Sequence, residues 1–143
     1  MAISYINIFK EILDKLLEVF KTEFKGSLPV YVGKEEMAGT QSLRIVPIRN
    51  VLLRYVLDAE DREFTLNLIL AFKDINTTQR GLEQSLNVVS RIEGLVNKNK
   101  TLTTLNSEKL INCRIISTDI SELPDNGYEI IFIFKCQHTN IVR

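Results

Sequence analysis

The chain has 143 residues, its 18 Lys and Arg are balanced by 18 Asp and Glu, and its formal net charge is zero. Hydrophobic residues make up 45 % and charged residues 25 %, as in an average soluble globular domain. This composition excludes a disordered chain, which would contain fewer apolar residues and more net charge. It also excludes a strongly basic nucleic-acid-binding module, because Lys and Arg are not in surplus.

The length predicts a single domain over residues 1–143, since a chain of about 150 residues buries roughly 70 % of its unfolded surface. No uninterrupted apolar run approaches the length of about 18 residues that a membrane span needs, so we expect no membrane segment. The N-terminal sequence lacks the basic start and small-residue cleavage site of a signal peptide, and we expect a cytoplasmic protein. Cys113 and Cys136 are too few for a disulfide framework and are predicted to be buried free thiols.

An amphipathic helix is predicted over about residues 3–25. The segment has no Pro or Gly, and Gly26 is a plausible stop. Apolar side chains recur every three or four residues, which is typical of a helix with one buried face: Ile6, Phe9, Leu13, Leu16, Leu17, Phe20 and Phe24. The polar face carries both signs of charge, which favours packing on a sheet or a second helix over binding to a membrane surface.

A β-rich region is predicted over residues 42–74, after a short edge strand at 29–32 and an exposed polar loop at 33–41. We expect strands at 42–48 and 51–57, a polar turn at 58–61 and a long alternating strand at 62–74, which pairs with 51–57 as an antiparallel hairpin. Pro47 cannot donate to a strand ladder and therefore suggests an edge strand or a bend.

A second helix is predicted over about residues 78–97, and a C-terminal hairpin over residues 109–138. The turn signal Pro124-Asp125-Asn126-Gly127 separates the two strands of this hairpin. The order of elements predicts an α+β fold, with an antiparallel sheet of about four to five strands and two helices packed on one face.

Few residues point to chemistry. His138 is the single histidine, and Cys136 with His138 is the one spacing that resembles a metal-ligand pair, although the end of an ordinary strand looks the same. The acidic pairs at Glu35-Glu36 and at Asp58, Glu60 and Asp61 are expected to be solvated turn residues. No phosphate-binding loop or nucleophile elbow is present in the sequence. We therefore predict no catalytic, cofactor-binding or metal-binding residue, no cofactor, and no enzyme activity.

Arginines are regularly placed in the β-rich region. Arg44, Arg49 and Arg54 are five residues apart, and Arg62 lies across the predicted turn. Three interpretations stay open: solvated charge, pairing across an interface with acidic side chains of the 35–36 and 58–61 segments, and contact with DNA. The candidate interface residues are Lys34, Glu35, Glu36, Arg49, Arg54 and Arg62.

The layout of the chain resembles that of the tail-terminator (tail completion, head–tail joining) proteins of long-tailed bacteriophages. The resemblance covers nearly the whole chain and rests on the order of the elements and their hydrophobic pattern. Its segments are the N-terminal helix, a strand ending in VYVG, the polar loop, SLRIVPI, EFTLNLILAF, the helix with LEQSLNVVSRIEGLV, and the strands LINCRIIS and GYEIIFIFKCQ.

This resemblance implies a structural virion protein that is assembled in the host cytoplasm. It implies a homo-oligomeric ring, usually a hexamer, which caps the tail tube, contacts the tail tube protein and the head-connector protein, and lets DNA pass through its lumen. Two alternatives remain: another neck or tail-tube component of a phage or injection machine, and a small α+β enzyme or ligand-binding domain. A tube protein would polymerise, whereas an enzyme would need a pocket in which charged side chains converge.

Overall fold

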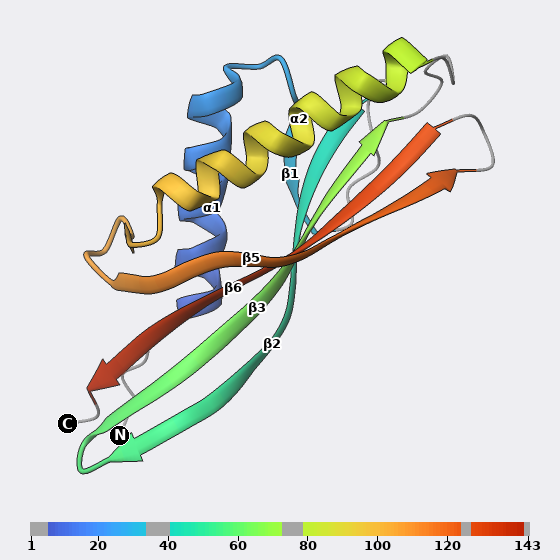
Figure 1. The fold of residues 1–143 in the computed structure, drawn as a ribbon. Helices are drawn as coiled ribbons and strands as arrows, with labels where there is room; N and C mark the ends of the chain where they lie inside the picture. The colour runs from blue at the N-terminus through green and yellow to red at the C-terminus, as the bar shows by residue number, and fades with distance from the viewer. Residues whose placement is uncertain (1–5, 34–40, 73–78, 124–126, 142–143) are drawn as a thin grey trace.

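The computed structural model describes residues 6–33, 41–72, 79–123 and 127–141. Strands hold more of these residues than helices do, and Figure 1 shows two helices lying over one face of a long, strongly twisted sheet. The elements in chain order are α1 (Ile8–Phe24), β1 (Val30–Val32), β2 (Gln41–Val56), β3 (Ala59–Phe72), α2 (Gln79–Lys98), β4 (Leu102–Thr103), β5 (Lys109–Leu123) and β6 (Gly127–Ile141).

The predicted fold class is wrong in its sheet. The strands form one six-stranded sheet in the order β1-β2-β3-β6-β5-β4. β1 runs parallel to β2, and the other neighbours are antiparallel, so the sheet is mixed. The protein is therefore a mostly β fold with a curled six-stranded mixed sheet and two helices, not an α+β fold with four to five antiparallel strands. Of the two outermost strands, β1 lies within the edge strand expected at 29–32, whereas β4 has only two residues, too few to show a periodicity in the sequence.

The first hairpin differs from the prediction at two places. The two strands expected at 42–48 and 51–57 are one continuous strand, β2, whose pairing with β3 shifts register between Pro47 and Arg49 and again between Leu52 and Arg54. β3 begins at Ala59 rather than at residue 62, because the chain turns at 57–58, and of the residues expected in the turn only Asp58 lies there. The antiparallel pairing of the hairpin is confirmed.

α2 and the second hairpin lie where they were expected, whereas α1 begins at Ile8 rather than at about residue 3. α1 is capped by Asn7, whose Oδ1 accepts from the backbone N–H of Lys10 at 3.1 Å, and the chain leaves the helix through Lys25 in the left-handed conformation. α2 matches the predicted range to within one residue at each end, and β5 with β6 forms the C-terminal hairpin. In the expected loop at 33–41, residues 34–40 lie outside the described part of the chain, and Gln41 already belongs to β2.

The hydrophobic core lies between the two helices and the central strands. The strands contribute alternate residues and the helices residues three or four apart, and the largest completely buried side chains include Phe20 of α1, Ile92 of α2, Leu68 of β3, and Phe132 and Phe134 of β6. The helices also contact each other, because the guanidinium of Arg91 in α2 lies 3.0 Å from the Glu23 carboxylate and 4.6 Å from the ring centroid of Phe24. Neither described helix combines the length and the hydropathy that crossing a bilayer requires.

Both cysteines lie in this core as free thiols, which confirms the prediction. A hydrogen bond with Cys113 and burial raise the pKa of Cys136 far above its ordinary value. A thiol that stays protonated is a poor nucleophile and a poor metal ligand, so we assign Cys136 to packing.

Candidate assembly interface

The outer part of the first hairpin, residues 47–63, extends beyond the helices, and we call it the arm (Figure 1). The last residue of β2 that belongs to the core is Ile45, and each residue of β2 from Pro47 to Val56 is exposed. The exposed side chains of the arm are nevertheless mostly large and apolar: Ile48, Val51, Leu52, Leu53, Tyr55, Val56 and Leu57. A contiguous apolar surface of this kind marks an interaction site, or else a site of aggregation.

The arm is apolar on both faces because its sequence does not alternate. In VLLRYVL, residues 51–57, apolar side chains occupy successive positions, and successive positions of a strand point to opposite faces. The register shift after Leu52 adds one more residue on the β2 side. Only a partner that reaches around the arm would cover both faces.

Leu57 at the tip combines exposure with strain. It is 89 % exposed, and its φ of 53° lies in the left-handed region, where a branched aliphatic residue is unusual. Glycine or asparagine would suit this turn position better. A strained, solvent-exposed Leu contributes nothing to the stability of the isolated chain, so its presence favours a role in binding.

Polar contacts hold the arm together on each face. On the outer face, the Asp61 carboxylate accepts from Thr139 Oγ1 at 2.5 Å and lies 3.2 Å from Arg54, which links β6, β3 and β2. The hydrogen bond from Thr139, and then the charge of Arg54, lower the pKa of Asp61. On the inner face, Arg62 Nη1 donates to Asn50 Oδ1 at 2.8 Å, and its Nε lies 2.9 Å from the Glu60 carboxylate.

These contacts change the interpretation of the predicted interface arginines. Arg54 and Arg62, for which pairing across an interface was one of three open interpretations, pair within the chain, and their side chains are 72 % and 35 % exposed. Arg49 is exposed and has no polar side-chain contact within the described residues. The other three candidates, at 34–36, lie outside the described part of the chain. The arm thus brings the three arginines onto one hairpin. The exposed apolar surface between them was not predicted from the sequence.

An ionic cluster lies at the centre of the sheet face that the helices leave uncovered. Glu63 of β3 lies 3.0 Å from Arg114 of β5 and 3.3 Å from Lys135 of β6. Hydrogen bonds, chiefly from Arg114, lower the pKa of Glu63. The cluster joins three strands at the base of the arm, which gives the arm a firm attachment to the rest of the sheet.

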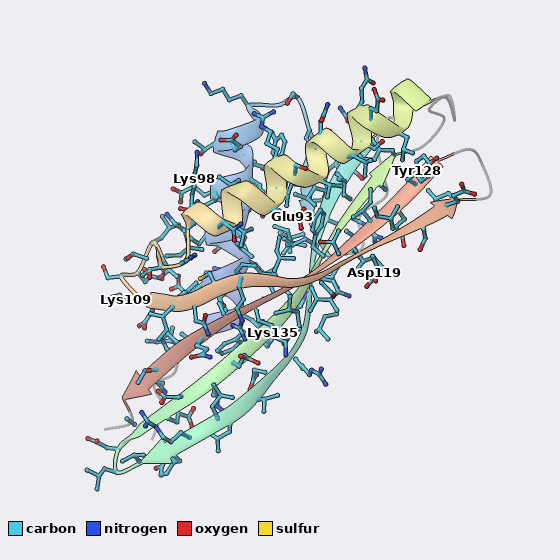
Figure 2. All side chains as sticks on the ribbon, in the orientation of Figure 1. Glu93, Lys98, Lys109, Asp119, Tyr128 and Lys135 are labelled. Carbon is cyan, nitrogen blue, oxygen red and sulfur yellow. The ribbon has the colours of Figure 1, made fainter. Side chains whose placement is uncertain are left out.

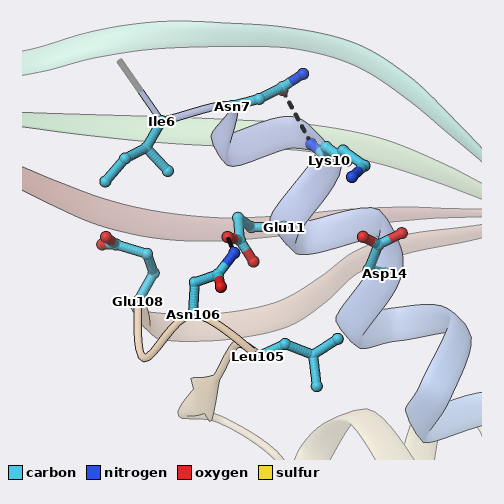
Figure 3. Close-up of a pocket in the computed structure, with 8 residues that line it drawn as sticks. All are labelled: Ile6, Asn7, Lys10, Glu11, Asp14, Leu105, Asn106 and Glu108. Atoms are coloured by element: carbon cyan, nitrogen blue, oxygen red, sulfur yellow. Dashed lines mark hydrogen bonds between the residues drawn. The ribbon is translucent and has the colours of Figure 1, made fainter. Parts of the chain in front are cut away.

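A hollow of about 490 Å³ lies between the first turn of α1 and the loop before β5. Figure 3 shows Glu11 and Asn106 facing each other across it, joined by a hydrogen bond, with Ile6 and Leu105 also lining it. Nearby, the 3 % exposed His138 bonds Glu108 Oε2 through Nε2 at 2.8 Å. These polar groups satisfy one another.

No metal-binding group emerges from the described residues. Among the residues that the structure describes, no three His, Cys, Asp or Glu side chains lie close enough together to hold an ion. The candidate pair of Cys136 and His138 does not form a site, since Cys136 contacts Cys113 and His138 contacts Glu108.

Comparisons with solved structures support the fold. A chain from the structure "Virion of native gene transfer agent (GTA) particle" superposes with a TM-score of 0.64; it is 10 % identical, and the match covers 96 % of this chain and 100 % of that chain. A second solved structure matches with a TM-score of 0.59 at 13 % identity and covers 95 % of each chain. No protein-family model and no curated protein matches the sequence. At such low identities, these likenesses establish a shared fold.

Proposed function

We propose that the protein is a structural component of a virion or of a phage-like particle. The support is a full-length likeness in fold to a chain of the gene transfer agent virion, together with an arm whose apolar surface has no partner within the described chain. A subunit of a particle buries such surfaces against its neighbours, whereas a protein that acts alone would leave them exposed to water.

Within the particle, we propose the role of a tail terminator, with no catalytic activity. The protein would form a ring, a hexamer in related proteins, which caps the last layer of the tail tube and offers its other side to the head connector. DNA would pass through the lumen. The order of the elements supports this role, and the exposed arm is the single observation that carries the expectation of a ring, because ring subunits need surfaces that neighbours cover.

The test combines light scattering with negative-stain microscopy of the purified protein, alone and mixed with tail tubes. A terminator forms discrete rings or binds the tube end as a single layer that stops growth. A protein that stacks into open-ended tubes would instead be a tail-tube component. A stable monomer that forms no ring and leaves tail tubes uncapped would overturn the proposal.

A further inference from the structure

The sheet has an open strand edge on each side. β1 covers β2 only at 43–45, and β4 covers β5 only at 109–110. Beyond these short pairings, 46–56 of β2 and 114–123 of β5 have no strand neighbour on their outer side within the described residues. Figure 1 shows the two open stretches at opposite ends of the sheet. Open edges present unpaired N–H and C=O groups, and these add readily to another strand.

The hydrogen-bonding side of β2 follows from its pairing with β1. Leu43 donates its N–H to the Pro29 carbonyl at 2.9 Å, so its backbone groups point away from β3. Residues two apart point the same way, which directs Pro47 to the open edge, where its missing N–H costs nothing. Leu52 points the same way, because the β3 residues opposite Pro47 and Leu52 are four positions apart.

The two edges differ in charge and share exposed apolar side chains. The β2 edge carries Arg49 and Arg54 and no acidic residue. The β5 edge carries the exposed acid Asp119, between Ile116 and Ile120, which are 50 % and 49 % exposed. Opposite charges on facing strands attract, and like charges repel, so each edge suits the other better than it suits a copy of itself.

The charges also lie on the same face of the sheet. Arg49 is opposite Thr65 in β3, and Asp119 is opposite Ile131 in β6, and both positions belong to the face that the helices leave uncovered. Figure 2 shows Asp119 on the side of β5 away from α2. In a sheet that continued from one subunit into the next, Arg49 and Asp119 would therefore be on one surface.

We propose that the open edge of β2 in one copy pairs with the open edge of β5 in the next copy. The sheet would continue from subunit to subunit, and the exposed apolar side chains along the open edge of the arm would pack beside those of β5 in the neighbour. Because the two edges differ, the contact is head-to-tail, and such contacts close into a ring when the rotation between subunits permits. This inference rests on the proposed ring and assigns its contact surfaces.

Charge reversal tests the pairing of the two edges. We expect Arg49→Glu and Asp119→Lys to weaken self-association each by about fivefold or more at low salt. The two substitutions together in one chain should restore association, since every interface would again join opposite charges. Sedimentation velocity over a range of concentrations measures the effect. Single variants that assemble normally, a double variant without recovery, or dimers that depend on Arg49 but not on Asp119 would contradict the proposal.

A proline at the open edge tests the backbone pairing. Leu52→Pro removes an N–H that points away from β3, and Leu52→Ser is the matched control, because it removes the same apolar side chain but keeps the N–H. We expect Leu52→Pro to abolish rings and Leu52→Ser to weaken them. If the far-ultraviolet circular dichroism shows that Leu52→Pro misfolds, the charge-reversal variants at Arg49 and Asp119 test the proposal instead. If both tests leave assembly unchanged while rings still cap tail tubes, the edge inference fails alone; if the tests succeed and tubes stay uncapped, the terminator role fails alone.

Discussion

Leu57 offers the sharpest test of the arm, because stability and assembly should respond to its substitution in opposite directions. Asparagine adopts the left-handed conformation of this turn position more readily than leucine does. Leu57→Asn should therefore leave the free energy of unfolding of the isolated subunit unchanged or raise it by about 1 kcal/mol or less. The same substitution removes the most exposed apolar side chain of the arm.

The expected loss in assembly follows from the exposed fraction. Complete burial of a leucine side chain contributes about 1.5–3 kcal/mol. Leu57 is 89 % exposed, so a neighbour that covers it gains most of this value, about 1.3–2.7 kcal/mol. Its removal should raise the Kd of each subunit contact by roughly 10- to 100-fold.

The assay measures the midpoint concentration of assembly by mass photometry and sedimentation, and the unfolding temperature of dilute subunits. Leu105→Asn is the matched control, because Leu105 is 71 % exposed but lies away from the arm, in the loop before β5. This control should assemble like the unmodified protein. A wild-type midpoint for Leu57→Asn, or an equal loss for Leu105→Asn, would refute the assignment of the arm to assembly.

Three further predictions concern the fold and the ion pairs. The fold lowers the pKa of the Glu63 carboxyl from its ordinary value of 4.5. The ionised carboxylate therefore stabilises the folded state above pH 4.5, and this contribution is lost as the pH falls through the lowered pKa. Over the same fall in pH, the difference in unfolding temperature between the unmodified protein and Glu63→Gln should shrink. Phe132→Ala, at a completely buried position in β6, should cost about 3–5 kcal/mol in denaturant unfolding, and a cost under about 1 kcal/mol would contradict the core assignment. Cys136→Ala and His138→Ala should keep assembly activity, and a large loss in a folded variant would reveal a site at these residues.

Local patterns predicted the long elements of this fold well. The periodic apolar stripe of α1 and the Asn-Gly turn signal between β5 and β6 depend on neighbouring residues alone, so the second hairpin and the C-terminal end of α1 lie where expected. The mixed character of the sheet escaped prediction because β1, although expected as an edge strand, pairs in parallel with β2, and the two-residue β4 leaves no pattern in the sequence. The turn at 57–58 escaped because Leu57 is an unusual residue in the left-handed conformation, whereas the polar residues just after it have the composition of a turn.

The candidate interface was predicted only in part. Charged residues can be recognised in a sequence, whereas the burial of an apolar residue depends on which elements pack over it. Arg49, Arg54 and Arg62 were singled out by their spacing, but the distances that tie Arg54 to Asp61 and Arg62 to Glu60 arise only when β2 and β3 pair. The absence of alternation in 51–57 was visible, and it indicates a strand that is apolar on both faces. The sequence does not show, however, that this part of β2 extends past both helices, so that neither helix covers it.

The position of β6 has a consequence for the order in which the protein is completed. β6 is the last described strand along the chain, yet it lies at the centre of the sheet, between β3 and β5. During synthesis, the β2–β3 hairpin can form from local contacts. The other neighbour of β3 in the sheet is β6, which is made only after α2 and β5. Until β6 is made, the exposed apolar residues of this hairpin have Arg49 and Arg54 among them, and charges placed in this way lower the tendency of a strand to aggregate. A chain interrupted before β6 would lack the strand that joins β3 to β5, so the two open edges become the edges of one sheet only after β6 has been made.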